Sequence, residues 1–74
     1  RPRVEEFASV TGAGVTGRID GRFVRVGKRE WLKKEGVEIP ADFDAQAERL
    51  LAEGGTVIWI SFDQKAAGLL ALTD

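Results

Sequence analysis

The chain has 74 residues, with 11 basic and 12 acidic side chains, a net charge of −1 and neither cysteine nor histidine. This length allows one domain with a thin core, because a chain of this size buries only about 60% of its unfolded surface. The missing residue types exclude disulfides, thiolate or imidazole metal sites, a cysteine nucleophile and a Ser-His-Asp triad.

Net charge and hydropathy also limit the kinds of partner that the chain can have. The balanced charge argues against nucleic acid as a partner. No apolar run approaches the roughly 20 residues of a membrane span, so we expect no direct membrane contact by this segment. The chain starts at Arg1 without an initiator methionine and stops at Asp74, directly after an apolar run. We therefore expect residues 1–74 to be one domain fragment cut from a longer protein.

The first half of the sequence predicts three strands. Val4 to Val10 is one strand, and a turn over residues 11–14 follows it. Val15, Gly17 and Ile19 then alternate with polar residues, which is typical of a half-buried strand. Asp20-Gly21 predicts a type I′ hairpin turn. The returning strand, Arg22 to Val26, then pairs Ile19 with Arg22, Gly17 with Val24 and Val15 with Val26.

The second half predicts two helices and two more strands. Residues 28–35 form a short helix that ends at Gly36 with a left-handed cap. A second helix starts after Pro40, and Phe43, Ala47, Leu50 and Leu51 form its apolar stripe. Residues 56–62 predict a strand covered on both faces, and residues 66–72 predict another buried strand. The fold class is therefore α+β, an antiparallel sheet flanked by two helices in the order β-β-β-α-α-β-β.

The glycines at 12, 14 and 17 match the pattern G-x-G-x-x-G. A Rossmann site needs a helix at the third glycine, but a strand follows here. A protein-kinase glycine loop fails as well, because the chain has no room for the catalytic loop. Gly12 and Gly14 would let a flat nucleotide base approach the backbone, with Val15 as its apolar edge. A tight β-turn is the alternative, and from the residues alone it is the favoured explanation of these glycines.

Gly27 and Lys28 stand where a strand becomes a helix, so they are a second candidate anion site. A loop glycine and a solvated lysine are the alternative. Trp31 and Trp59 could stack on a base, but both stand at positions expected in the core. The carboxylate pairs at residues 42/44 and 5/6 point to different faces, so we expect no catalytic residues and no metal site.

Five motifs, taken together, resemble a known family over almost the whole chain. They are Phe7-x-x-x-Thr11-Gly12-x-Gly14-Val15-x-Gly17, Asp20-Gly21, Val26-Gly27-Lys28-Arg29-x-Trp31-Leu32, Glu53-Gly54-Gly55-Thr56-Val57, and residues 68–74, Gly-Leu-Leu-Ala-Leu-Thr-Asp. This series resembles the nucleotide-binding (N) domain of heavy-metal-transporting P-type ATPases. The stretch from Gly27 to Leu32 is most similar to the copper-transporting branch.

The resemblance implies a cytoplasmic domain of an integral membrane transporter. It implies that the domain binds ATP, with magnesium in the full-length enzyme, and presents the γ-phosphate to an aspartate in the phosphorylation domain of the same polypeptide. The nucleotide-binding residues would be Gly12, Gly14, Val15, Gly27 and Lys28. The whole enzyme would be a metal-ion translocase, and we expect no turnover from the 74 residues alone.

The sequence departs from the family pattern at several points. Lys28 stands where the family has asparagine, and Gln64 stands where a glycine is usual in the last hairpin. The family's Ser-Glu-His-Pro motif and its phosphorylated Asp-Lys-Thr-Gly-Thr loop are not in this sequence.

Two alternatives stay open. The same domain occurs in the zinc/cadmium and potassium pumps, and a non-catalytic interaction domain would use its exposed hairpin edge to bind a protein partner.

Overall fold

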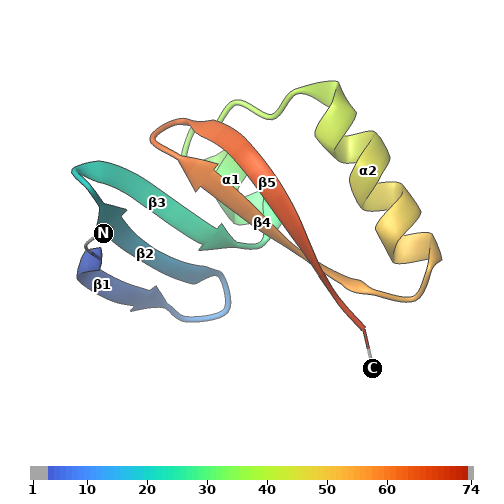
Figure 1. The fold of residues 1–74 in the computed structure, drawn as a ribbon, viewed down its shortest axis with the longest axis horizontal. Helices are drawn as coiled ribbons and strands as arrows, with labels where there is room; N and C mark the ends of the chain where they lie inside the picture. The colour runs from blue at the N-terminus through green and yellow to red at the C-terminus, as the bar shows by residue number, and fades with distance from the viewer. Residues whose placement is uncertain (1–3, 74) are drawn as a thin grey trace.

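The computed structural model describes residues 4–73 (Figure 1). The two ends discussed above, Arg1 to Arg3 and Asp74, lie outside these residues. In chain order the elements are β1 (Val4–Val10), β2 (Gly14–Ile19), β3 (Arg22–Gly27), α1 (Arg29–Lys34), α2 (Ala41–Ala52), β4 (Thr56–Phe62) and β5 (Lys65–Leu72). This order confirms the predicted β-β-β-α-α-β-β arrangement.

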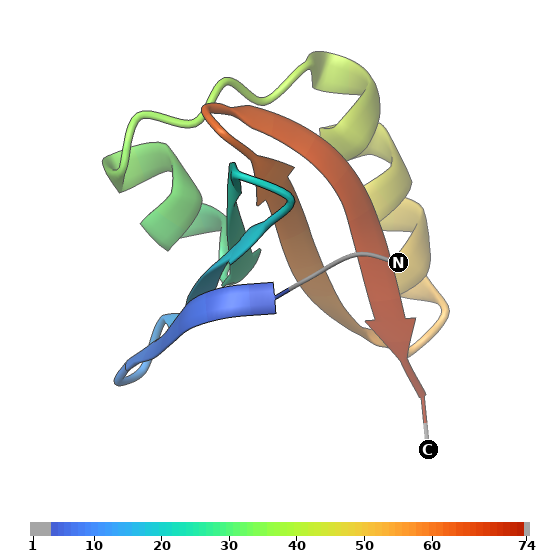
Figure 2. The same ribbon diagram turned by 60° about the vertical axis from the view of Figure 1, so that its left-hand side comes forward.

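The strands form one antiparallel sheet in which each strand pairs with its neighbours in sequence, from β1 to β5. The predicted β2–β3 register is confirmed, with Val15 opposite Val26, Gly17 opposite Val24 and Ile19 opposite Arg22. Asp20 and Gly21 have φ angles of 50° and 81°, as a type I′ turn requires. Figure 2 shows the strong twist that carries the sheet from β1 round to β5.

Both helices end at a glycine with a positive φ, and for α1 this is the end that the sequence predicts. At the end of α1, the Gly36 N–H donates to Lys33 O and the Val37 N–H donates to Leu32 O, each at 3.0 Å. Gly36 has a φ of 86°, so the pattern is a Schellman cap, and Gly54, with a φ of 89°, follows α2 in the same way. The apolar contact of the first cap is strong, because Leu32 and Val37 are 0% and 3% exposed.

The core lies between the two helices and one face of the sheet. Its buried members are Leu32, Val37, Ala47, Trp59 and Ala66, and Trp31, Phe43, Val57 and Leu69 pack against it. Trp59 therefore has the core position that the sequence predicts. Trp31 is only half-buried.

Three expectations about burial are wrong. The last strand, β5, is not buried: Ala66 is its one buried residue, and Leu70 and Leu72 are exposed. The side chains of β4 are not covered on both faces: Trp59 and Ser61 are buried, whereas Ile58 and Ile60 are only half-buried. Both helices pack on the Trp59 side, which explains the difference. Leu51, expected in the buried stripe of α2, is 57% exposed. Among residues 4–73, neither helix has the length and apolar character that crossing a bilayer requires.

Candidate functional site

The five predicted site residues gather at one corner of the sheet, where β2 begins and β3 ends. Gly14 lies directly opposite Gly27, and Val15 lies opposite Val26. The Lys28 N–H donates to the carbonyl of Ala13 at 3.0 Å and so closes the corner. Segments distant in sequence are thereby brought together at one corner of the sheet.

The glycines at this corner have a structural requirement of their own. A Cβ on Gly14 would lie 2.7 Å from the Cα of Gly27, and a Cβ on Gly27 would lie 2.8 Å from the Cα of Gly14. Each would also collide with a backbone carbonyl oxygen, of Val26 and of Ala13 respectively. Close approach of the two strands therefore requires both glycines, with or without a ligand.

Gly12 has a different role. It has a φ of 75°, and a Cβ built on it would have no atom within 4 Å. The Ala13 N–H donates to Val10 O at 3.0 Å, which closes a turn with Gly12 at its third position. The positive φ explains why a glycine stands at position 12, and the space around it is open.

Two hollows meet this corner from opposite faces of the sheet. A Cβ on Gly14 would point at the Trp31 ring on the helix side, so its neighbour Val15 points to the other side. The hollow at Val15 has a volume of about 120 Å³ and is lined by Val4, Phe7, Val15, Thr16, Gly17, Ile19, Val24 and Val26. The hollow on the helix side has a volume of about 390 Å³ and is lined by Gly12, Ala13, Lys28, Glu30, Trp31 and Lys34.

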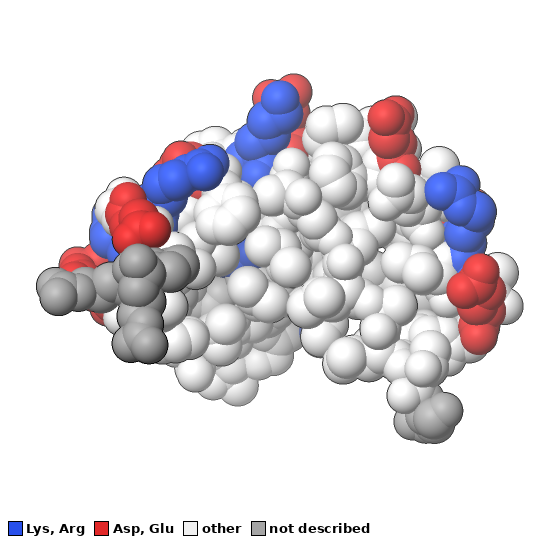
Figure 3. Space-filling model, in the orientation of Figure 1, with Lys and Arg blue, Asp and Glu red and all other residues white. Residues whose placement is uncertain are grey.

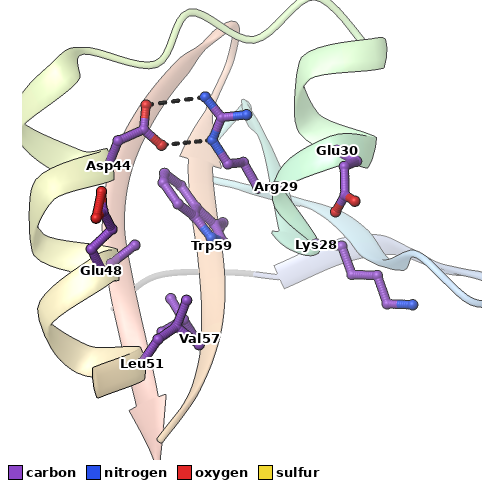
Figure 4. A pocket seen from close by; sticks show the side chains of 9 residues that line it. Lys28, Arg29, Glu30, Asp44, Glu48, Leu51, Val57 and Trp59 are labelled. Atoms are coloured by element: carbon purple, nitrogen blue, oxygen red, sulfur yellow. Dashed lines mark hydrogen bonds and ion pairs between the residues drawn. The ribbon is translucent and has the colours of Figure 1, made fainter. Parts of the chain in front are cut away.

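A third and larger hollow, of about 470 Å³, lies between α1 and α2 (Figure 4). Lys28 is the one predicted site residue among its lining residues. An ion pair forms part of the wall of this hollow: Arg29 Nε and Nη2 donate to the two carboxylate oxygens of Asp44 at 2.6 and 3.0 Å. The Arg29 guanidinium also lies 5.8 Å from the centre of the Trp59 ring.

The ion pair sets the charge of both partners. Hydrogen bonds from Arg29 lower the pKa of Asp44, and the hydrogen bond to Asp44 raises the pKa of Arg29. Asp44 is therefore a carboxylate at neutral pH and is already occupied, which makes it a poor general base. The pair joins the start of α1 to the first turn of α2. Nothing in the sequence connects two residues that are 15 positions apart, so only the fold reveals it.

The arginines on β2 and β3 are also paired. Arg18 meets Glu6 at 2.7 Å, Arg22 meets Asp63 at 3.5 Å, and Arg25 meets Glu35 at 3.9 Å. The Phe23 ring lies 5.5 Å from the Arg18 guanidinium and 4.7 Å from that of Arg25. These three arginines therefore have their positive charge matched by carboxylates, and Figure 3 shows basic and acidic side chains next to one another on the surface in view.

Gln64, one of the two departures from the family pattern, joins the last hairpin to α1. Its Nε2 donates to the carbonyl of Glu35 at 2.9 Å, and its Oε1 accepts from Arg25 Nη1 at 2.9 Å. A glycine could make neither bond. In the described part of the chain, no group of three or more acidic, cysteine or histidine side chains is arranged to hold a metal ion.

Known proteins were compared with both the sequence and the structure. No protein-family model matches the sequence. The "Copper-exporting P-type ATPase" of Bacillus subtilis is 41% identical over 73 residues, which is 99% of this chain and 9% of that protein. The "Probable cadmium-transporting ATPase" of Staphylococcus aureus is 34% identical over 73 residues, 97% of this chain and 10% of that protein. The chain thus spans about a tenth of the length of these relatives.

The solved structure of the N-domain of HMA6, described as a copper-transporting P-type ATPase, has the same fold. The TM-score is 0.71 at 23% identity, and the match covers 95% of this chain and 57% of that one. The chain is homologous to one segment of the copper- and cadmium-transporting P-type ATPases, and it has the fold of the HMA6 N-domain.

Proposed function

We propose that this chain is the ATP-binding portion of the cytoplasmic N-domain of a copper-translocating P-type ATPase. In that role it positions ATP, with its magnesium, for phosphorylation of an aspartate in a separate domain of the same polypeptide. The observation that carries the proposal is the match of 41% identity over 99% of the chain to a copper-exporting ATPase.

The corner of the sheet supports a nucleotide site. Val15 and Val26 lie side by side on β2 and β3 and line the apolar hollow, which suits the face of a base. Next to them, the Gly14–Gly27 pair presents backbone without side chains. Lys28 follows directly and supplies a positive charge for phosphate.

The proposed contribution to the reaction is binding and orientation. The corner offers an apolar face, backbone and one lysine, and the nearby Arg29 is engaged in an ion pair with Asp44. Holding ATP in a defined orientation makes transfer to a neighbouring domain effectively intramolecular, and catalysis of phosphoryl transfer consists almost entirely of positioning and electrostatic stabilisation.

Copper is the proposed cargo of the whole transporter. The copper-exporting relative is 41% identical to this chain, and the cadmium-transporting relative is 34% identical over a span of the same length. A zinc/cadmium pump is the second candidate, because the cadmium relative matches 97% of the chain.

Calorimetric titration of the chain with ATP and with GTP tests the proposal. We expect tighter binding of ATP, and Val15→Thr should weaken it by about three- to tenfold, because it places a hydroxyl in the apolar hollow. Val10→Thr is the matched control, since Val10 is 40% exposed and does not line that hollow. Equal binding of both nucleotides, or an equal effect of both substitutions, would contradict the proposal and favour an interaction domain.

A further inference from the structure

The ring of Trp31 packs against the glycine pair from the helix side of the sheet. A Cβ built on Gly14 would lie 2.9 Å from the Cζ3 atom of Trp31, so the ring contacts the β2 backbone where Gly14 faces Gly27. Trp31 also lines the helix-side hollow together with Gly12 and Ala13. One side chain of α1 therefore reaches the first residue of β2, at the corner where the predicted site residues meet.

The helix that carries Trp31 is held in place by its tertiary contacts. α1 has six residues, whereas an isolated helix needs roughly 12 to be even marginally stable, so its position depends on what it packs against. Leu32, the next residue, is 0% exposed in the core. The Arg29–Asp44 pair joins the start of α1 to α2. These contacts hold the flat indole ring as a fixed surface against β2.

The backbone that the ring contacts has little packing of its own. Gly12 and Gly14 have no side chains, and a Cβ on Gly12 would have no atom within 4 Å. Glycine leaves the backbone more conformational freedom than any other residue, and an aromatic ring packed on a glycine in a sheet compensates for the missing side chain. On the helix side Trp31 supplies this packing for Gly14, so it restricts the positions that the backbone there adopts.

We propose that Trp31 is a positioning residue for the nucleotide. It fixes Gly14 from the helix side and thereby places Val15, the next residue, on the opposite face, where the proposed function has the base. This role rests on the proposed function and involves no contact between Trp31 and ATP, because the paired backbones of β2 and β3 lie between the ring and the hollow at Val15. Its contribution is preorganisation, since the apparent affinity falls with the fraction of molecules in which the corner is correctly arranged.

Calorimetric titration with ATP compares the parent chain with three variants. Trp31→Leu keeps an apolar side chain but removes the ring, and we expect it to weaken ATP binding about tenfold, as when the competent arrangement is populated about one-tenth of the time. Trp31→Phe retains a ring and should weaken binding by about threefold at most. Phe43→Leu is the matched control, because it removes a half-buried aromatic ring from the same core but on α2, away from the helix-side hollow. It should change the affinity by less than about twofold, and amide dispersion confirms that each variant is folded.

Two further measurements separate positioning from other roles of the ring. In the ATP-free chain, ¹⁵N relaxation should show greater mobility of the Gly12 and Gly14 amides in Trp31→Leu than in Phe43→Leu. In the parent, ATP should leave the quenching of Trp31 fluorescence by acrylamide unchanged. Trp59 is 4% exposed, so it contributes little to this quenching.

Three results would overturn the positioning role and leave the proposed function intact. They are an unchanged ATP affinity in Trp31→Leu, equal weakening by Trp31→Leu and Phe43→Leu, and shielding of Trp31 from acrylamide by ATP, which would mean that the ring stacks on the base. A folded parent that binds no ATP would instead contradict the proposed function, and the role of Trp31 in placing a nucleotide would fail with it.

Discussion

Gly14 and Gly27 face each other across β2 and β3 so closely that neither has room for a Cβ. We predict that Gly14→Ala and Gly27→Ala each destabilise the fold by about 1–3 kcal/mol, because the colliding atoms belong to the backbone and cannot turn aside. Thermal unfolding followed by circular dichroism measures this loss.

Gly68→Ala is the control for that series. Gly68 lies inside β5, its φ is not positive, and a Cβ on it would have no atom within 4 Å. We expect a change within about 0.5 kcal/mol. If all three variants lose stability equally, strand propensity and not the close approach of β2 and β3 explains the glycines. If Gly14→Ala and Gly27→Ala are as stable as the parent, β2 and β3 lie farther apart at this pair than described.

The second prediction concerns Leu32, which among residues 4–73 is the largest apolar side chain with no exposure at all. Leu32→Ala should cost about 2–5 kcal/mol, which is comparable to the whole stability expected of so small a domain. Leu51→Ala, at a side chain that is 57% exposed, should cost about 0.5 kcal/mol or less. Chemical denaturation of both variants measures the difference, and similar costs would contradict the described core.

The third prediction concerns Ser61. Its side chain is 0% exposed, and its Oγ has no hydrogen-bond partner. An unpaired buried hydroxyl contributes a desolvation cost and nothing in return, so Ser61→Ala should leave stability unchanged or raise it by up to about 1 kcal/mol. A loss of more than about 1 kcal/mol in urea unfolding would show that the hydroxyl is bonded in solution.

The Arg29–Asp44 pair makes stability depend on pH. The pKa of Asp44 is lowered in the folded chain because Arg29 donates hydrogen bonds to it. The pair therefore stabilises the fold above the carboxyl's unfolded pKa, about 4, and this contribution is lost as pH falls through the lower folded value. Asp44→Asn should lower the melting temperature at pH 7 and have less effect as the solution approaches pH 2.

Asp42→Asn is the matched control, because Asp42 is also in the first turn of α2 but outside the ion pairs described. Both substitutions remove one negative charge near the start of the helix. An equal effect of the two at pH 7, or a pH-independent effect of Asp44→Asn, would show that the ion pair does not stabilise the fold.

Local patterns in the sequence predict most of the fold. The Asp20-Gly21 turn and the alternation around it determine the β2–β3 register, and Gly36 ends α1 where expected, because these signals depend on neighbouring residues. The exposure of Leu51 and of the second face of β4 was not predictable in this way. Both depend on the placement of the two helices on one side of the sheet, which no local pattern specifies.

The candidate site was predictable to a smaller degree. The family resemblance names Gly12, Gly14, Val15, Gly27 and Lys28, and the fold brings them to one corner. Gly14 and Val15 face opposite sides of the sheet because neighbouring residues of a strand alternate between its two faces. This alternation can be predicted from the sequence. The pairing of Arg29 with Asp44 and the position of Lys34 beside Lys28 depend on tertiary contacts, so the structure was needed to find them.

The nucleotide site itself is tested most directly by amide NMR titration of the ¹⁵N-labelled chain with ATP, with GTP as the comparison. We predict shifts that are larger for ATP and concentrated at Gly12, Gly14, Val15, Gly27 and Lys28, with little change in α2. A well-dispersed spectrum in which these amides do not move, or move equally for both nucleotides, would contradict an ATP site at this corner of the sheet.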